Sequence, residues 1–259
     1  MGIFETHAHY TDDAFNEDRD EVLNSMKDNN VDYIVEIGDN IDRSIRAVKL
    51  AKKYNFMYAA VGIHPEQVDD VTEDDYIKLT ELLDRKEENK IVAVGEIGLD
   101  YYYTKDNKEK QIELFRRQLD IALKYNMPCV IHTRDASQDT FEIVKEYAQK
   151  GLKAIIHCFS ESLELANEYV KLGMLIGVGG VLTFKNGKKL VQVVENLDMN
   201  NFVLETDSPY LAPEPNRGTR NDSRNIKYVA EKMAEIKGIS YDEILDITSK
   251  NAKEFYNIK

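Results

Sequence analysis

Short apolar segments alternate with longer amphipathic segments along almost the whole chain of 259 residues. Apolar runs of this length are typical of buried strands, whereas apolar residues repeated every three or four positions are typical of helices that bury one face. The apolar segments cover residues 3–8, 33–37, 57–62, 91–97, 129–132, 154–157, 174–178 and 202–206. The alternation predicts an α/β protein with a parallel sheet, because consecutive parallel strands need a helical crossover.

Helical patterns lie between the predicted strands and after the last of them. They cover residues 18–28, 43–54, 75–86, 108–125, 140–149, 163–172, 188–196, 225–237 and 241–255. Eight strand–helix units in a chain of this length favour a closed (β/α)8 TIM barrel, which needs about 250 residues, over an open doubly wound sheet. No Gly-, Ser- or Pro-rich linker divides the chain, so we expect one domain over residues 1–259.

The charge of the chain restricts the partners that we expect. Asp and Glu number 47 against 34 Lys and Arg, which gives a formal net charge of −13. This excess disfavours broad binding to nucleic acid or to an anionic membrane, although metal ions in a local site can override the global sign. The longest uncharged, apolar and glycine-rich run, residues 174–184, is too short to span a bilayer.

The number of cysteines and the N-terminal residues indicate the cellular compartment that we expect for the protein. Cys129 and Cys158 are too few for a disulfide framework and are typical of a reducing cytosol. The N-terminal residues lack the basic and apolar regions of a secretory signal peptide. We therefore expect a cytoplasmic protein. Nothing in the sequence marks an interface, so we expect a monomer without an obligate protein partner.

All five histidines fall at or just after the carboxyl end of a predicted strand: they are His7, His9, His64, His132 and His157. In a parallel barrel, active sites are built on this face. One such histidine would more often be a satisfied core or surface residue, but scattered histidines would not be expected to sort this way. His7 and His9 can meet one metal ion, because side chains at i and i+2 of a strand point to the same face.

Acidic residues, like the histidines, lie in or just after predicted strands. Glu96 lies in an apolar strand, where an unpaired charge is costly, so it needs a metal ion or, alternatively, a buried Arg or Lys. Glu205 and Asp207 share one face of the last strand by the same two-residue period. Asp207 is nearer the strand end and is the better metal ligand, whereas Glu205 lies deeper and is expected to orient a histidine ligand.

The candidate ligands on this rim are too many for one catalytic zinc ion, which keeps about three protein ligands and an open position. They are enough for two metal ions, which together activate water and clamp a phosphate or carbonyl oxygen. Imidazole and carboxylate ligands accept Zn²⁺, Mn²⁺ or Mg²⁺, so we expect two divalent cations of unspecified identity.

Six short motifs, in this order, resemble the TatD family of metal-dependent deoxyribonucleases within the amidohydrolase superfamily. The resemblance covers residues 4 to about 251, so nearly the whole chain. The motifs are Glu-Thr-His7-Ala-His9, Gly62-Ile-His64-Pro65, Gly95-Glu96-Ile-Gly-Leu-Asp100, Ile131-His132-Thr-Arg134-Asp-Ala, His157-Cys-Phe-Ser and Glu205-Thr-Asp207-Ser-Pro-Tyr-Leu. Each motif is short, but six in register are specific.

The resemblance implies a ligand set and a substrate. A first metal ion would be held by His7, His9, Glu96 and Asp207. A second would be held by Glu96, His132 and His157, with Glu96 bridging the two. The activity that the resemblance implies is hydrolysis of DNA from its 3′ end, with single strands or 3′ ends as the substrate. RNA and D-aminoacyl-tRNA are further substrates that the resemblance suggests.

The chain departs from the family pattern in two places. Glu5 stands where the family commonly has Asp, which changes only the length of the side chain. In a late loop, Thr219 stands where many members have lysine, and Asp222 and Ser223 stand where many have Glu-Pro. The missing lysine bears on phosphate affinity and on the identity of the substrate.

Further residues receive roles in phosphodiester hydrolysis. We expect Asp207 to act as the general base for the attacking water, and His64, outside the ligand set, to contact the phosphate or donate a proton. Arg134 and Arg217 are candidate phosphate clamps, since guanidinium binds phosphate through two hydrogen bonds; the alternative is a solvated surface role. Tyr101 is a candidate for base stacking, and the alternative is a packed wall beneath a loop.

Two other functions remain open at this point. An amide or ester hydrolase could use the same metal ions, for example on a cyclic amide or on D-aminoacyl-tRNA. A non-catalytic interaction barrel is the third interpretation. The complete set of metal ligands stands against it, because a binding module has no need for six buried ligands on one rim.

Overall fold

The computed structural model of the protein describes residues 1–102 and 106–258. Eight parallel strands form one sheet in the order of the sequence, and at least one helix follows each of them. The strands are β1 (Ile3–Ala8), β2 (Val31–Ile37), β3 (Met57–Val61), β4 (Ile91–Asp100), β5 (Cys129–Arg134), β6 (Ala154–Ile156), β7 (Leu175–Val178) and β8 (Phe202–Leu204). The predicted alternation of strands and helices is confirmed.

The helices also follow the predicted pattern. They are α1 (Arg19–Asn24), α2 (Ile41–Lys53), α3 (Glu73–Asp84), α4 (Lys108–Lys124), α5 (Ser137–Ala148), α6 (Leu163–Lys171), α7 (Lys188–Asn196), α8 (Ile226–Lys237) and α9 (Tyr241–Tyr256). Among the helices of the described residues, none has the length and apolar character that crossing a bilayer requires.

Several strands end at other residues than the apolar pattern predicts, and two of these differences bear on the candidate site. β4 continues to Asp100, because it pairs with β5 as far as the partners Asp100 and Arg134. β8 ends at Leu204, and three residues later Asp207 adopts a left-handed backbone conformation with a φ of 59°. The chain therefore turns sharply where Asp207 stands, a conformation that Asp tolerates better than most residues.

The chain divides into two compact units. The first unit comprises Met1–Glu36, Cys158–Lys171 and Leu175–Lys259. The second unit comprises Ile37–His157 and Leu172–Met174. Each unit contributes its own strands, helices and candidate ligands.

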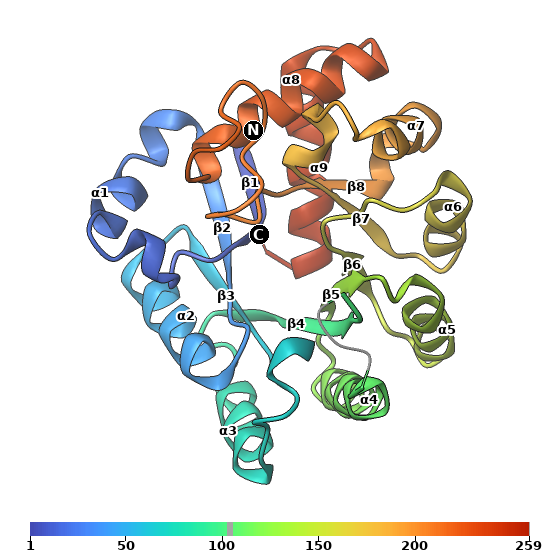
Figure 1. Cartoon of the computed structure of the whole chain (residues 1–259). Coiled ribbons are helices and arrows are strands. Elements are labelled where there is room, and N and C mark those ends of the chain that lie inside the picture. Colours follow the sequence, from blue (N-terminus) through green and yellow to red (C-terminus); the bar gives the residue numbers. More distant parts are fainter. Residues whose placement is uncertain (103–105, 259) are drawn as a thin grey trace. The chain divides into compact units, whose positions relative to one another are not determined.

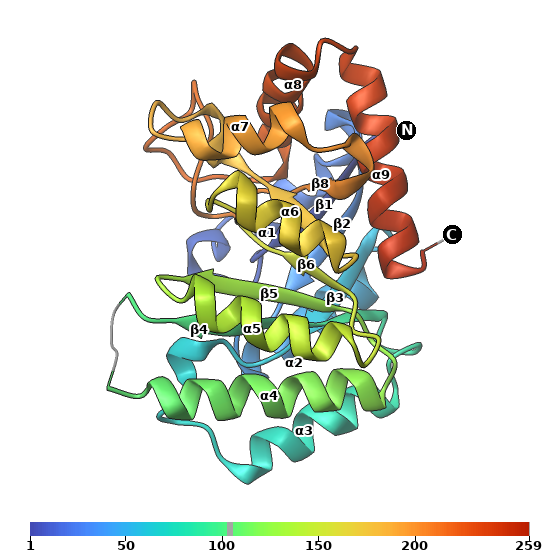
Figure 2. The ribbon, with the colours of Figure 1, turned by 90° about the vertical axis from the view of Figure 1, so that its right-hand side faces the viewer.

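In the first unit, β1 pairs with β2 and β7 pairs with β8. β1 also lies beside the segment that follows β8, because the His9 N–H donates to the Ser208 carbonyl at 2.8 Å. The last helix, α9, runs beside β1 and β8 (Figure 1, Figure 2). Its Tyr256 ring stacks on Phe4 of β1 with a centroid distance of 5.9 Å.

In the second unit, β3, β4, β5 and β6 pair in this order. Figure 2 shows α4 between α3 and α5 on the outside of these strands. A buried amide on α4 fixes the segment after β3: Gln118 Nε2 donates to the Ile63 carbonyl at 2.9 Å, and the Ile63 N–H donates to Gln118 Oε1 at 2.8 Å. This pair of bonds holds the chain immediately before His64.

Asn251 provides a test of how α9 is attached to β8. Its buried side-chain Nδ2 donates to the carbonyls of Met199 and Phe202, at 2.9 and 2.8 Å. We expect Asn251→Ala to lower the free energy of unfolding by about 2 kcal/mol, because it leaves two buried carbonyls without this donor. Urea denaturation measures the change. Lys250→Ala, an exposed change on the same helix, should stay within about 0.5 kcal/mol, and an equal loss in both variants would contradict the assignment.

Candidate metal centres

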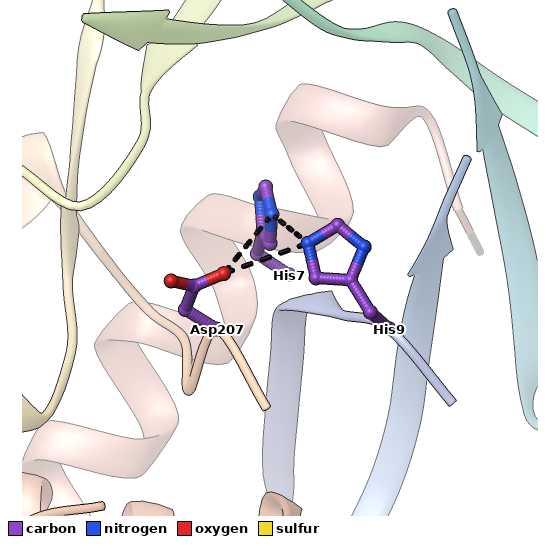
Figure 3. A group of neighbouring side chains, drawn as sticks. All are labelled: His7, His9 and Asp207. Carbon is purple, nitrogen blue, oxygen red and sulfur yellow. Dashed lines mark hydrogen bonds and ion pairs between the residues drawn. The ribbon is translucent and has the colours of Figure 1, made fainter. Parts of the chain in front are cut away.

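The first unit brings His7, His9 and Asp207 together (Figure 3). The Nε2 atoms of the two histidines lie 3.0 Å apart. Asp207 Oδ1 lies 3.7 Å from His7 Nε2 and 3.5 Å from His9 Nε2. His7 lies on β1 and His9 directly after it, both buried, while Asp207 follows β8.

These three atoms fit a divalent cation. In a tetrahedral zinc site with bonds of about 2.0–2.1 Å, ligand atoms lie about 3.3 Å apart. The three distances of this cluster, 3.0, 3.5 and 3.7 Å, scatter around that spacing. Two buried imidazoles and one carboxylate are also the donor types that zinc and manganese accept. His7, His9 and Asp207 could therefore form one face of a metal site.

Glu5 holds the two segments of this cluster in register. The N–H groups of His7 and Thr206 both donate to Glu5 Oε1 at 3.0 Å, and the Thr206 hydroxyl donates to Oε2 at 2.7 Å. Burial raises the pKa of Glu5 to about 8, although the hydrogen bonds from Thr206 and His7 oppose the shift. The Glu5 side chain, where the family commonly has Asp, thus reaches both segments.

Glu36, at the end of β2, shapes the chain after His9. Its two carboxylate oxygens accept the N–H groups of Tyr10 and Thr11 at 2.8 and 2.7 Å. Burial raises the pKa of Glu36 to about 7, and the charge of His9 opposes this rise. Glu36 has no role among the sequence-based predictions, although it is a charged residue in an apolar run, the same signal that identified Glu96.

The second unit contains the other cluster, around Glu96. Glu96 Oε1 lies 2.9 Å from His132 Nδ1 and 3.8 Å from the Nε2 atoms of His64 and His157. His64, Glu96 and His132 form a group able to hold a metal ion. The predicted second ligand set of Glu96, His132 and His157 therefore lies around one oxygen atom. The predicted sharing of Glu96 between two metal ions stays a prediction.

Asp100 is a functional residue that the sequence reasoning left without a role. Its Oδ2 lies 2.9 Å from His132 Nε2, so His132 stands between two carboxylates. Burial by itself lowers the pKa of His132. The hydrogen bonds to Asp100 and Glu96 and the charges of these two carboxylates outweigh burial and raise the pKa to about 9. Gln111 of α4 fixes the Asp100 backbone, accepting from its N–H at 2.9 Å and donating to its carbonyl at 2.8 Å.

A backbone hydrogen bond favours one tautomer of His64. Its Nδ1 accepts the Glu66 N–H at 3.2 Å, so the neutral ring carries its hydrogen on Nε2. A neutral imidazole cannot donate and ligate through the same nitrogen. With this hydrogen, Nε2 would donate toward Glu96, 3.8 Å away, and the predicted place of His64 outside the ligand set stays a prediction.

Glu205 lies deep below the rim, as predicted. Its Oε1 accepts the Cys158 N–H at 2.6 Å. Gly177 of β7 leaves the space for this carboxylate, because a Cβ there would lie 2.4 Å from Glu205 Oε2. The expected role of Glu205 in orienting a histidine stays a prediction.

The predicted substrate-binding residues differ in their surroundings. The Arg217 guanidinium carbon lies 3.8 Å from the Phe184 ring centroid. The Arg134 guanidinium carbon lies 3.7 Å from the centroid of the Tyr102 ring. Tyr101 is only 7% exposed, and its hydroxyl donates to Asp139 at 2.9 Å. Its burial favours the packed-wall alternative, and its role in base stacking stays a prediction.

The loop between β8 and α8 is fastened at both ends. Asn221 Nδ2 donates to the carbonyls of Thr206 and Tyr210, at 3.1 and 2.8 Å. Arg220, next to the family departure at Thr219, makes two hydrogen bonds with Asp18, at 2.7 and 2.6 Å. The loop that carries Asp207 is thus tied to β8 and to the segment before α1.

Comparison with known proteins gives the family. The family model described as TatD related DNase matches residues 4–257. YabD of Bacillus subtilis, named as an uncharacterised metal-dependent hydrolase, is 40% identical over 256 residues that cover 99% of each chain. Mouse TATDN3, whose name marks it as a suspected deoxyribonuclease, is 30% identical over 262 residues that cover 97% of this chain and 87% of its own.

A solved structure agrees with these relatives. YJJV, a TatD homologue from Escherichia coli, superposes with a TM-score of 0.92 at 28% identity and covers 99% of this chain and 98% of its own. The likeness confirms the predicted (β/α)8 TIM-barrel fold class. With a family match along almost the whole chain and histidine–carboxylate clusters at the strand ends, the chain belongs to the TatD family of metal-dependent hydrolases.

Proposed function

We propose that the chain hydrolyses phosphodiester bonds of DNA, preferentially at the 3′ end of single strands, with two divalent cations. The observation that carries the proposal is the pair of histidine–carboxylate clusters: His7, His9 and Asp207 in the first unit, and Glu96 with its histidines in the second. Two cations suit a reaction in which both the attacking and the leaving oxygen develop charge. The name of the mouse relative supports DNA as the substrate.

Each cluster would hold one cation. When bound, such cations polarise phosphate oxygens and make water more acidic. His7, His9 and Asp207 would hold the first cation, and Glu96, His132 and His157 the second. Asp100 would orient His132 through its hydrogen bond to Nε2.

Asp207 is the candidate general base. One carboxylate oxygen faces the two imidazoles, and the other points away from both of them (Figure 3). The side chain is 20% exposed, so solvent can reach it. This second oxygen would accept a proton from the attacking water, while the first would remain with the histidines.

His64 is the candidate donor to the substrate. Its Nε2–H results from the bond between Nδ1 and the Glu66 N–H, and its side chain is 12% exposed. It would donate a hydrogen bond to a phosphate oxygen or a proton to the leaving oxygen. Arg134 and Arg217 would bind neighbouring phosphates.

Cleavage of a 5′-labelled single-stranded oligonucleotide tests the proposal. With Mg²⁺ or Mn²⁺ we expect a ladder of products shortened from the 3′ end, which EDTA abolishes. Asp207→Asn should lower the rate by about 100-fold or more, because the amide cannot accept the proton. Absence of cleavage by a protein that binds nearly two metal equivalents would contradict a DNase and move the substrate to the amide or ester class.

Metal content measured by inductively coupled plasma mass spectrometry tests the two sites separately. We expect about two equivalents in the wild type. His9→Ala and His132→Ala should each remove about one, since each takes a ligand from a different cluster. One equivalent in the wild type, or loss of both ions in each variant, would contradict two separable sites.

His64→Gln separates a donor from a ligand. We expect hydrolysis to fall by about 100-fold, because Gln cannot transfer a proton, while the metal content stays that of the wild type. The Nδ1 bond to Glu66 is the reason for the unchanged metal content. Loss of one metal equivalent in His64→Gln would contradict the assignment and make His64 a ligand.

A further inference from the structure

Arg217 lies over an aromatic ring in the first unit. Its guanidinium carbon is 3.8 Å from the centroid of Phe184, which is close enough for face-to-face contact. Arg217 is exposed and Phe184 half-buried, so the ring supports one side of the guanidinium while solvent reaches the other.

The two loops that carry these residues are packed together. Phe184 follows the short 3₁₀ helix Gly180–Thr183 after β7, and Arg217 lies in the loop after β8. The Glu214 N–H donates to the Thr183 hydroxyl at 2.9 Å. A Cβ at Gly180 would lie only 2.0 Å from the Leu211 carbonyl, so this glycine permits the close approach. The same loop begins with Asp207 and therefore connects Arg217 to the first metal centre.

Arg217 is also available for an anion. Within residues 1–102 and 106–258, no ion pair joins Arg217 to a carboxylate, whereas Arg220 and Arg224 are paired with Asp18 and Asp222. Three exposed lysines follow Phe184: they are Lys185, Lys188 and Lys189. The segment after Phe184 thus carries three positive charges in a chain whose net charge is −13.

We propose that Arg217, supported from one side by the Phe184 ring, is a stacking platform for a nucleobase of a single-stranded substrate. This inference rests on the proposed phosphodiesterase function and adds how the substrate is held. Unpaired bases stack on guanidinium planes and on aromatic rings in proteins that bind single strands. The edge of the guanidinium remains able to bind a phosphate. Arg217 is the residue that contacts the base, and Phe184 positions it.

The platform explains a preference for single strands in physical terms. A base within a duplex is already stacked on both faces, whereas an unpaired base can lie on Arg217. Loss of the platform should therefore weaken binding to single strands more than binding to duplexes.

Fluorescence anisotropy with a labelled single-stranded oligonucleotide in EDTA tests this platform without catalysis. Phe184→Leu and Arg217→Lys should each weaken binding about 5-fold or more, because each removes one layer of the stack. Arg217→Ala should in addition reduce the slope of log Kd against log salt by about 0.7, the value for one phosphate contact on a single strand. Phe184→Leu should leave that slope unchanged. Its affinity for duplex DNA should change less than 2-fold.

Matched controls are available in the chain. Tyr228→Leu removes another half-buried ring of the first unit, and Arg46→Ala removes an exposed arginine of the second; both should bind as the wild type does. Unaltered thermal unfolding and metal content would show that each variant is folded. Wild-type affinity in Phe184→Leu and Arg217→Lys would overturn the platform.

Hydrolysis of bis(p-nitrophenyl) phosphate by the wild type separates the platform from the reaction. This small diester has no nucleobase, so its hydrolysis tests the phosphodiesterase function alone. Hydrolysis of the diester together with unchanged oligonucleotide binding in the variants would overturn the platform and leave the function standing. No hydrolysis of either substrate would overturn the function itself.

Discussion

The hydrogen bonds of the buried Glu5 carboxylate are the interaction on which the first metal centre depends. One side chain of β1 accepts the N–H of His7 and both the N–H and the hydroxyl of Thr206, and so joins the strand that carries two histidines to the segment that carries Asp207. A carboxylate in this position is expensive to bury unless donors surround it. Glu36 repeats the arrangement one strand away, where it accepts the N–H groups of Tyr10 and Thr11. The ligands are thus placed by acidic side chains that never need to touch the cation.

In the second unit, amides of α4 have the corresponding role. Gln118 fixes the chain before His64, and Gln111 fixes the backbone of Asp100, which in turn contacts His132. The helix therefore does more than cover an apolar strand. Through two buried glutamines, it determines where one donor and one candidate ligand stand. Both units use the same principle: secondary structure brings a candidate ligand to the strand end, and a buried polar group then sets its orientation.

The site residues that could be predicted from sequence are those whose position follows from the two-residue period of a β-strand. His7 and His9 lie two residues apart at the end of an apolar run, and Glu96 interrupts another, so their position on the rim follows from strand geometry. Asp100 shares a face with Glu96 by the same rule, yet β4 was expected to end at residue 97, which concealed the relation. Gln111 and Gln118 carry no such signal, because polar residues of an amphipathic helix are normally on its solvent side. Gln111 and Gln118 are buried instead, and whether a helix residue is buried depends on how the helix is rotated against the sheet.

The two attachments of Asn221 have a consequence for how such a protein can diversify. Its amide bonds the carbonyls of Thr206 and Tyr210, and thereby closes the loop after β8 into a ring. The first half of this ring packs against the loop after β7 through Leu211 and Glu214. The entropic penalty of lengthening a closed loop grows only with the logarithm of its length. The exposed residues Arg217, Gly218 and Thr219 at the tip of the ring can therefore be exchanged or extended, and new substrate contacts acquired, with little effect on the position of Asp207. Different residues of one loop would therefore determine the position of the catalytic carboxylate and the specificity for the substrate, and each set could change in evolution without the other.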